Sequence, residues 1–350
     1  MIASTVKDAA RQIRQWQRDR EHDAARIPVS AEQVGPPRAL FLTPDTNVPA
    51  GGIRVMYRHV DILNSAGIPA TILHQRPGFR CTWFDNDTDV TDVTAASVGP
   101  RDLLVIGELQ TDLLPRRGIN VRHVVLNQSG HLTWDTHPDA VDAHYASPQA
   151  PLATIVVSEQ SRRLVSLAFP DQDVRRVHLF VDTDLFHPLD GLPARRLVYM
   201  PRRGLREAQM ALRLLKNTGA LDGWEVRPLD GLTQTQVAAE LRNSRLFLST
   251  TFQEGFGYPV AEAMASGVFV VGSHGFGGQE LFDGGHARAV AHGDVLGLVD
   301  AVSELTAADA ADPDALRGPA LGAREFIAST YTREAERRDV VAAYSDLVLS

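Results

Sequence analysis

The chain has 350 residues, which is enough for two domains of ordinary size. Hydrophobic residues make up 44% of it and charged residues 22%, as is typical of globular proteins, and no apolar run reaches the length of a bilayer span. The net charge of −8 argues against a general nucleic-acid binder, because phosphate backbones are bound by clustered cations.

The cysteine content and the first residues indicate the cellular compartment. The single cysteine, Cys81, excludes an intramolecular disulfide and a metal site built on cysteines. The opening residues, MIASTVKDAARQ, lack the apolar core of a signal peptide. We therefore expect a cytoplasmic protein.

Residues 5–26 have apolar side chains at roughly helical intervals, which predicts an N-terminal amphipathic helix. Its basic side chains are Lys7, Arg11, Arg14 and Arg18. They could contact an anionic membrane surface, which leaves peripheral membrane contact open, but interspersed acidic residues and weak hydrophobicity favour a solvated helix packed on the protein. Residues 28–37 are predicted to be a linker.

Residues 39–73 predict a strand, a helix and a second strand. Gly51 and Gly52 precede the helix, Gly67 ends it, and residues 70–73 begin the second strand. In such a βαβ unit the glycine pair lies at the carboxyl end of a strand, where open α/β sheets bind ligands. The dinucleotide fingerprint GxGxxG is absent.

Further apolar runs at 103–106, 121–126 and 154–158 predict strands. The second run leads into the polar loop NQSGHLTWDTHP, which contains His131 and His137. A histidine in a loop is more often structural or simply exposed than part of a site. Both readings stay open for His131, and His137 is the weaker candidate.

A second sheet is predicted to start at residues 196–200, with Arg202 and Arg203 at the end of its first strand. A guanidinium fork matches phosphate oxygens and stays charged, so these arginines suit a diphosphate; a solvated basic turn is the alternative. Residues 224–228 predict the next strand, which is followed by a loop at 229–231.

The most informative stretch is 245–271, which predicts a strand, a glycine loop, a helix and another strand. An apolar run at 246–248 is broken by polar residues up to Gln253, and Glu254-Gly255-Phe256-Gly257 follows. Pro259 suits the first turn of a helix, and residues 268–271 open the next strand.

The same stretch combines a phosphate site with two carboxylates. A helix N-terminus after glycines presents free N–H groups to a phosphate. Glu254 and Glu262 flank it with seven residues between them, and carboxylates accept hydrogen bonds from sugar hydroxyls. The alternative is a strand–loop–helix unit with a solvated Glu262.

The residues EGFGYPVAEAMASG resemble the E-x7-E signature of family 4 of the retaining nucleotide-sugar glycosyltransferases. This resemblance implies that Glu254 lies by the donor sugar, that Glu262 binds the nucleotide ribose, and that Gly255, Phe256 and Gly257 form the donor loop. Downstream, GSHGFGGQE resembles the family's next glycine-rich loop, which adds Glu280 as a donor-binding candidate.

The resemblance extends to the rest of the chain. It implies that Gly51 and Gly52 meet the donor diphosphate and the acceptor, and that His131 touches the transferring sugar and acts with Glu254 in catalysis. Arg202 matches a family arginine, but Glu207 stands where many relatives have a lysine. Arg203 or Arg206 would have to replace that lysine as a donor-binding residue.

The expected fold is α/β, with two Rossmann-like domains that face a cleft, the GT-B architecture. We predict an N-terminal helix and linker at 1–36, an acceptor-side domain at 37–190, a nucleotide-sugar domain at 191–325, and a helix at 326–350 that crosses back to the first domain. Segment VHLFVDTDLFHP resembles the family's connection between domains.

The expected activity is transfer of a sugar from a nucleoside-diphosphate sugar to a hydroxyl of a saccharide, lipid-linked or small-molecule acceptor. The resemblance implies retention of the anomeric configuration. Aspartate pairs such as Asp85/Asp87 and Asp182/Asp184 match a D-x-D pattern by chance, and no carboxylate cluster suggests a metal cage. We expect neither a metal nor another cofactor.

Two other classes remain open. One is a different enzyme on the same fold, such as a sugar-nucleotide epimerase; a phosphorylase is less favoured, because no lysine suited to pyridoxal phosphate stands out. The other is a catalytically silent protein that binds sugar nucleotides.

Overall fold

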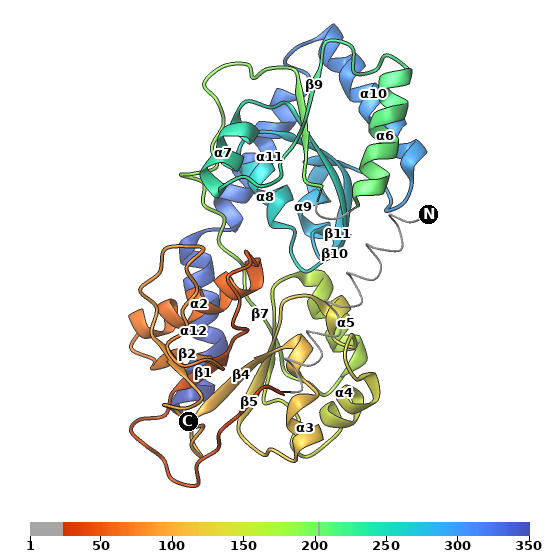
Figure 1. Ribbon diagram of the computed structural model, residues 1–350. Coiled ribbons are helices and arrows are strands. Elements are labelled where there is room, and N and C mark those ends of the chain that lie inside the picture. Colours follow the sequence, from red (N-terminus) through yellow and green to blue (C-terminus); the bar gives the residue numbers. More distant parts are fainter. Residues whose placement is uncertain (1–23, 202–203) are drawn as a thin grey trace.

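The computed structural model describes residues 24–201 and 204–350, which form two α/β domains stacked one above the other (Figure 1). The first, here the N-domain, contains a seven-stranded sheet in the order β3-β2-β1-β4-β5-β6-β7. The second, the C-domain, contains a five-stranded sheet in the order β12-β11-β10-β8-β9. All neighbouring strands run parallel.

The strands of the N-domain are β1 (Ala39–Leu42), β2 (Ala70–His74), β3 (Val90–Asp92), β4 (Leu103–Gly107), β5 (His123–Asn127), β6 (Thr154–Val156) and β7 (Val174–Arg176). Those of the C-domain are β8 (Arg196–Tyr199), β9 (Glu225–Pro228), β10 (Leu246–Glu254), β11 (Phe269–Phe276) and β12 (Ala287–Ala289).

The helices that follow N-domain strands are α2 (Gly51–Ser65), α3 (Leu113–Arg117), α4 (Pro138–Tyr145) and α5 (Glu159–Ala168). The later helices are α6 (Leu205–Asn217), α7 (Gln234–Arg242), α8 (Tyr258–Ala265), α9 (Gln279–Phe282), α10 (Val295–Ala311), α11 (Arg317–Thr330) and α12 (Arg333–Leu349). Three short 3₁₀ turns are η1 (Glu108–Gln110), η2 (Gly130–Leu132) and η3 (Asp283–Gly285).

Each sheet is covered on both faces, which explains why its strands read as continuous apolar runs. In β1, Ala39 and Phe41 join the cluster under α2 and α12, whereas Leu40 and Leu42 join the cluster on the other face. Successive side chains of a strand point to opposite faces, so one strand serves both cores. The C-domain is built in the same way, with α8 and α11 on one face and α6 and α10 on the other.

The central strand of the C-domain is longer than the sequence predicts. The polar residues after Leu248 were expected to end it, but β10 continues to Glu254 and pairs with β11, with an irregular register between Thr251 and Glu254. The hydroxyls of Ser249 and Thr251 donate to the carbonyl oxygen of Ser273 on β11. Polar residues remain in the strand because the neighbouring strand provides acceptors for them.

The stretch predicted as a linker is attached to the N-domain. Val29 forms a parallel bridge with Val98, and Ser30 N–H donates to the Val98 carbonyl oxygen. Ile27 is buried in the core. The predicted N-terminal helix lies almost entirely outside the described residues.

The last helix returns to the N-domain, as the sequence predicts. Tyr344 of α12 is fully buried, and its ring lies 5.5 Å from that of Phe41 and 5.8 Å from that of His59. The chain thus passes twice between the domains. The two passages are joined by a hydrogen bond from Val181 N–H to the carbonyl oxygen of Tyr331.

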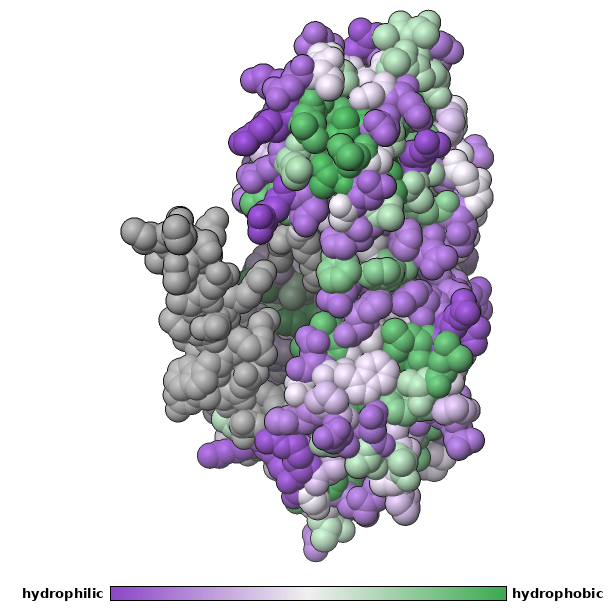
Figure 2. Space-filling view, turned by 90° about the vertical axis from the view of Figure 1, so that its right-hand side faces the viewer, coloured by the Kyte–Doolittle hydropathy of each residue, from purple (hydrophilic) through white to green (hydrophobic). Residues whose placement is uncertain are grey.

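The surface facing the viewer in Figure 2 is mostly hydrophilic, with separate hydrophobic patches on both domains. Scattered apolar side chains are ordinary on a protein surface. Within residues 24–201 and 204–350, the structure contains no helix whose length and apolar character would let it cross a membrane.

Candidate functional site

Glu254 is held by an unusual backbone at the end of β10. The preceding residue, Gln253, has a positive φ of 54°, and Glu254 pairs with Phe276, whose φ is 70°. Left-handed backbone is uncommon outside glycine and often marks functional sites. Gly275 is also left-handed, with φ +65°, and a Cβ there would lie 3.1 Å from Glu254 Cγ. The glutamate side chain therefore lies over a glycine.

Gly255 lies directly against the backbone of the N-domain. A Cβ at this position would lie 1.5 Å from the backbone carbonyl oxygen of Gln128, which follows β5 of the N-domain. No side chain fits there. Next along the chain, Phe256 packs its ring against Tyr258 and Tyr331. Because the ring is engaged there, only the backbone of Phe256 is left for its predicted role in the donor loop. Gly257, with φ +92°, is the N-cap residue of α8.

The glycine pair of the N-domain lies against the same elements. A Cβ at Gly51 would lie 3.6 Å from the ring of Tyr258, and one at Gly52 would lie 3.1 Å from Nε2 of Gln128. The side-chain amide of Gln128 donates to the carbonyl oxygen of Gly52. Residues 51–54, 128–131 and 254–262 therefore meet in one region, here named the junction.

Three helices that begin at or near the junction lack a side-chain cap. The N-cap residues are Ala50 for α2, Gly204 for α6 and Gly257 for α8, and none accepts a hydrogen bond through its side chain. Thr233 caps α7 and Thr332 caps α12, whereas α3, α4, α9 and α11 also lack a side-chain cap. Uncapped helix N-termini leave N–H groups and a positive dipole end for an anion.

Arg206 lies in the first turn of α6 and is exposed. Gly204 before it, with φ +68°, lies against the carbonyl oxygen of Thr250 in the middle of β10, from which a Cβ would be 2.0 Å away. The first turn of α6 is thereby brought next to β10. Arg202 and Arg203 lie outside the described residues, so their predicted roles stay predictions.

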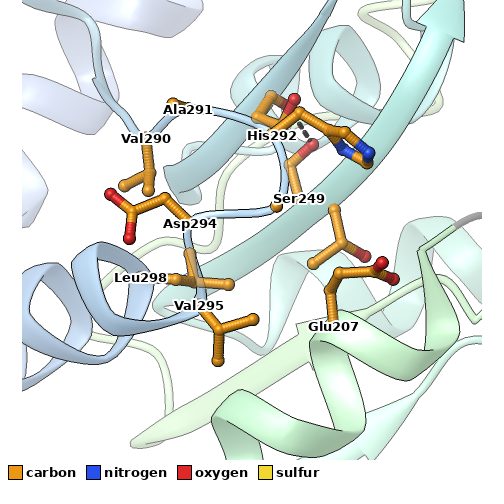
Figure 3. A pocket seen from close by; sticks show the side chains of 11 residues that line it. Glu207, Ser249, Val290, Ala291, His292, Asp294, Val295 and Leu298 are labelled. Carbon is orange, nitrogen blue, oxygen red and sulfur yellow. Dashed lines mark hydrogen bonds between the residues drawn. The ribbon is translucent and has the colours of Figure 1, made fainter.

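Glu207, which replaces the family lysine, lines a small pocket beside β10. Figure 3 shows Glu207 on one side of this pocket and Val290, Asp294 and Leu298 on the other. Its volume is about 10 Å³, which is about the room that one water molecule needs. A sugar nucleotide does not fit in this pocket.

Glu262 lies on α8, partly buried, next to residues from both domains. Burial raises the pKa of Glu262 to about 7, while the charge of Arg54 and a hydrogen bond from Gln234 act in the opposite direction. Arg54 belongs to α2 of the N-domain, and its Nη1 donates to Oε1 of Gln234 over 3.0 Å. Glu262, the residue predicted to bind the ribose, thus has hydrogen-bonding side chains of both domains beside it.

Glu280 has its carboxylate engaged in contacts between domains. One oxygen accepts hydrogen bonds from Arg176 at 2.7 Å and from the Tyr331 hydroxyl at 2.9 Å. The other accepts from Glu159 N–H at 3.0 Å. These bonds tie α9 of the C-domain to β7 and α5 of the N-domain. Its predicted contact with a donor stays a prediction and would have to be made in addition to them.

His131 faces Phe276 at the end of β11 in the C-domain. The centroids of the two rings are 4.9 Å apart, and His131 Nε2 lies 3.2 Å from Nε2 of Gln160. Burial lowers the pKa of His131, so the neutral imidazole is favoured at neutral pH. The histidine therefore lies beside the strand end that pairs with Glu254.

Several residues in or beside the junction were not singled out in the sequence. Gln128 was quoted only within its loop, and Arg54 and Gln234 carried no signal beyond their polarity. Glu108 is a fourth: it is 8% exposed, and its Oε2 accepts a hydrogen bond from Gln128 N–H at 3.1 Å. Burial raises the pKa of Glu108 to about 7.

The predicted site residues are therefore largely brought together from distant parts of the chain. Gly51, Gly52, Gly255 and Glu262 meet around Gln128 and Arg54, and His131 approaches the loop of Glu254 from the N-domain. Among the residues that the structure describes, no group of three or more histidine, cysteine, aspartate or glutamate side chains could hold a metal ion.

Comparison with known families gives one match. The model described as "Glycosyl transferases group 1" matches residues 205–308, a segment that contains Glu254, Glu262 and Glu280. A search of curated proteins found no match.

Solved structures share the fold over nearly the whole chain. Sucrose-phosphate synthase from Thermosynechococcus elongatus aligns with a TM-score of 0.68 and 14% identity, covering 89% of this chain and 99% of that one. HepE of Anabaena, in complex with UDP and glucose, aligns with a TM-score of 0.62 and 12% identity, covering 88% and 99%. A glycosyltransferase from Rickettsia africae aligns with a TM-score of 0.58 and 14% identity, covering 90% and 99%. The protein thus has the predicted GT-B fold.

Proposed function

We propose that this protein is a glycosyltransferase that moves a sugar from a nucleoside-diphosphate sugar to an acceptor hydroxyl, with retention of the anomeric configuration. The observation that carries the proposal is the junction itself. Two strand–glycine–helix units, one from each domain, meet at Gln128 with Glu254 and Glu262 beside them. The match of residues 205–308 to a glycosyl transferase model and the shared GT-B fold support it.

In this proposal the C-domain holds the nucleotide. Glu262 accepts hydrogen bonds from the ribose hydroxyls, since a carboxylate has two oxygens for a vicinal diol. Arg202, with Arg203 or Arg206, binds the diphosphate together with the N–H groups at the starts of α2, α6 and α8. The UDP bound in the HepE structure is a ligand of the same class.

The sugar lies between Glu254 and His131. Glu254 orients its hydroxyls, and His131, neutral because burial lowers its pKa, contacts them from the N-domain. The bond between the anomeric carbon and the phosphate oxygen breaks while the acceptor oxygen forms a bond on the same face. The acceptor proton passes to the leaving phosphate oxygen, so atoms and charges balance without a covalent enzyme intermediate.

Stabilising the leaving diphosphate is the main catalytic contribution in this scheme. Preorganised hydrogen-bond donors at a developing negative charge contribute about 3–4 kcal/mol each. The arginines and helix N-termini provide such donors without a metal ion. We therefore propose that turnover persists in excess EDTA.

Nucleotide binding is the first test. Thermal unfolding is measured with UDP, GDP, ADP and their glucose conjugates, because a ligand of the native state raises its melting temperature. Glu262→Ala should weaken binding of the best ligand about tenfold or more, as expected for lost hydrogen bonds to a charged group. Glu304→Ala, at an exposed glutamate of α10, is the control. Unchanged affinity in both Glu262→Ala and Arg202→Ala would refute the assignment.

Stereochemistry and turnover are the second test. Proton NMR of the first product should show the anomeric configuration of the donor, before any free sugar equilibrates. Inversion would contradict the retaining mechanism. Conversion of the donor without an acceptor would indicate an epimerase, and binding without turnover on an acceptor panel would indicate a silent binding protein.

A further inference from the structure

Arg54 of the N-domain reaches across the junction to the predicted ribose ligand in the C-domain. It is the fourth residue of α2, and its Nη1 donates to Oε1 of Gln234 over 3.0 Å. The Gln234 amide in turn hydrogen-bonds the carboxylate of Glu262. The three side chains come from α2, α7 and α8, so they meet only when the two domains are together.

The surroundings of Glu262 make Arg54 its principal cation. Burial disfavours the charged form of the carboxyl, whose pKa rises to about 7, and Arg54 is the charge that opposes this rise among the described residues. Tyr258, on the same helix, lies close to Arg58 and Glu336 as well as to Arg54. Helix α11 also packs on α8 and carries Arg324 and Glu325. Neither of these shifts the Glu262 pKa.

Arg58, one helical turn further along α2, is engaged elsewhere. It forms an ion pair with Glu336 and lies over the ring of Phe180, where the chain passes between domains. Among the described residues, Arg54 makes no such contact with the segments that connect the two domains. Its described side-chain hydrogen bond goes to Gln234 of the other domain.

We infer that Arg54 is a positioning residue of the nucleotide site: from the N-domain, and through Gln234, it holds the carboxylate of Glu262 charged and oriented for the ribose. This inference rests on the proposed function, because it presupposes that Glu262 binds the nucleotide. A carboxylate can accept hydrogen bonds from both hydroxyls of the ribose diol. The protonated acid has an O–H group and therefore less capacity to accept hydrogen bonds from them. Domain closure and nucleotide affinity are thereby coupled.

The experiment is the pH dependence of binding between pH 5.5 and 9, with the nucleoside diphosphate that gives the largest thermal shift among UDP, GDP and ADP. The proteins are the wild type, Arg54→Ala, Arg54→Lys and the surface control Arg288→Ala. Wild-type affinity should fall as the pH drops through about 7, the value at which Glu262 protonates. The titration of the nucleotide itself is common to all four proteins.

Removing Arg54 should move the midpoint upward by about one unit, because a nearby cation lowers a carboxyl pKa. Affinity of Arg54→Ala at pH 7 should then be about fivefold below that of the wild type, and the two should converge by pH 9. Arg54→Lys, which retains the charge, should keep the wild-type midpoint. In Glu262→Gln, which has no carboxyl group to titrate at this position, the fall in affinity near pH 7 (the pH step) should disappear.

Each other outcome overturns the inference. An equal loss of affinity at every pH would mean a direct contact or a purely structural role for Arg54. A wild-type midpoint in Arg54→Ala, or a retained pH step in Glu262→Gln, would remove the link to Glu262 while leaving nucleotide binding intact. If the wild type binds none of the nucleotides, the proposed function fails and this inference fails with it.

Discussion

The two strand–glycine–helix units at the junction look alike in sequence but tolerate change differently. In the N-domain, β1 leads through Gly51 and Gly52 into α2, which has 15 residues; in the C-domain, β10 leads through Gly255 into α8, which has 8. A Cβ at Gly52 would meet the end of the Gln128 side chain, whereas one at Gly255 would meet the Gln128 backbone. A side chain can rotate away, but the backbone at the end of a buried strand cannot.

The largest effect is expected at Gly255. In Gly255→Ala the new methyl would lie 1.5 Å from the carbonyl oxygen of Gln128, so the domains would have to separate. A displacement of about 1 Å at a catalytic site costs about 100-fold in rate, and we expect at least this loss of turnover. Nucleotide affinity should fall far less, by about fivefold at pH 7, because separation withdraws Arg54 from Gln234 and Glu262. Steady-state kinetics and small-angle scattering measure the two consequences.

Gly318→Ala is the matched control, because nothing lies within 4 Å of a Cβ at that position of α11. It should keep wild-type kinetics. Wild-type turnover in Gly255→Ala would show that the contact with Gln128 is not part of the active arrangement.

Two carboxyls near Gln128, Glu262 of α8 and Glu108 of η1 in the N-domain, offer a second contrast. The pKa of each is raised to about 7, but Glu262 has Arg54 beside it, whereas the groups that lower the pKa of Glu108 are backbone N–H donors. At pH 4 Glu108 is protonated in both the folded and the unfolded protein and costs nothing. Between pH 4.5 and about 7 folding requires the carboxyl to take up a proton, and above about 7 it requires the charge to be buried, so stability is lost as the pH rises from about 4.5 to about 7.

Glu108→Gln should therefore raise the free energy of unfolding at pH 8 by about 2 kcal/mol, since the rise of the pKa from 4.5 to about 7 corresponds to at most about 3.4 kcal/mol. The gain should vanish at pH 4. Urea unfolding at both values measures it, with the exposed Glu304→Gln as control. A gain of the same size at pH 4 would mean that packing, and not ionisation, distinguishes the two side chains.

The smallest effect is expected at Gly52, where the neighbour is movable. Gly52→Ala should reduce turnover about tenfold or less, because a Cβ 3.1 Å from Gln128 Nε2 requires only that this side chain shift. Adding Gln128→Ala should relieve part of the loss, since it removes the obstructing amide. The same second substitution should not rescue Gly255→Ala, whose obstacle is the carbonyl oxygen. Equal rescue at both glycines would abolish the distinction between the two units.

Much of the fold could be predicted from local patterns. The helix after Gly51 and its end near Gly67 are confirmed, as are the central strand and the helix at Pro259, whereas the return of the last helix was expected from the family resemblance. These features depend on apolar periodicity and on glycine positions that a short stretch of chain reveals. The predicted end of β10 after Leu248 was wrong. Hydroxyl-bearing residues continue the strand because β11 accepts their hydrogen bonds, which the local sequence does not show.

The sequence by itself determined the residue types of the site: glycines before helices, two glutamates seven residues apart, and a histidine after an N-domain strand. It could not determine which of them touch. Gln128 lies about 75 residues from Gly52 and further still from Gly255, and only the packing of two sheets brings it between them. Arg54 and Gln234 are 180 positions apart and look like ordinary surface residues in the chain. Their meeting depends on the angle between domains, which tertiary contacts set and local spacing does not encode.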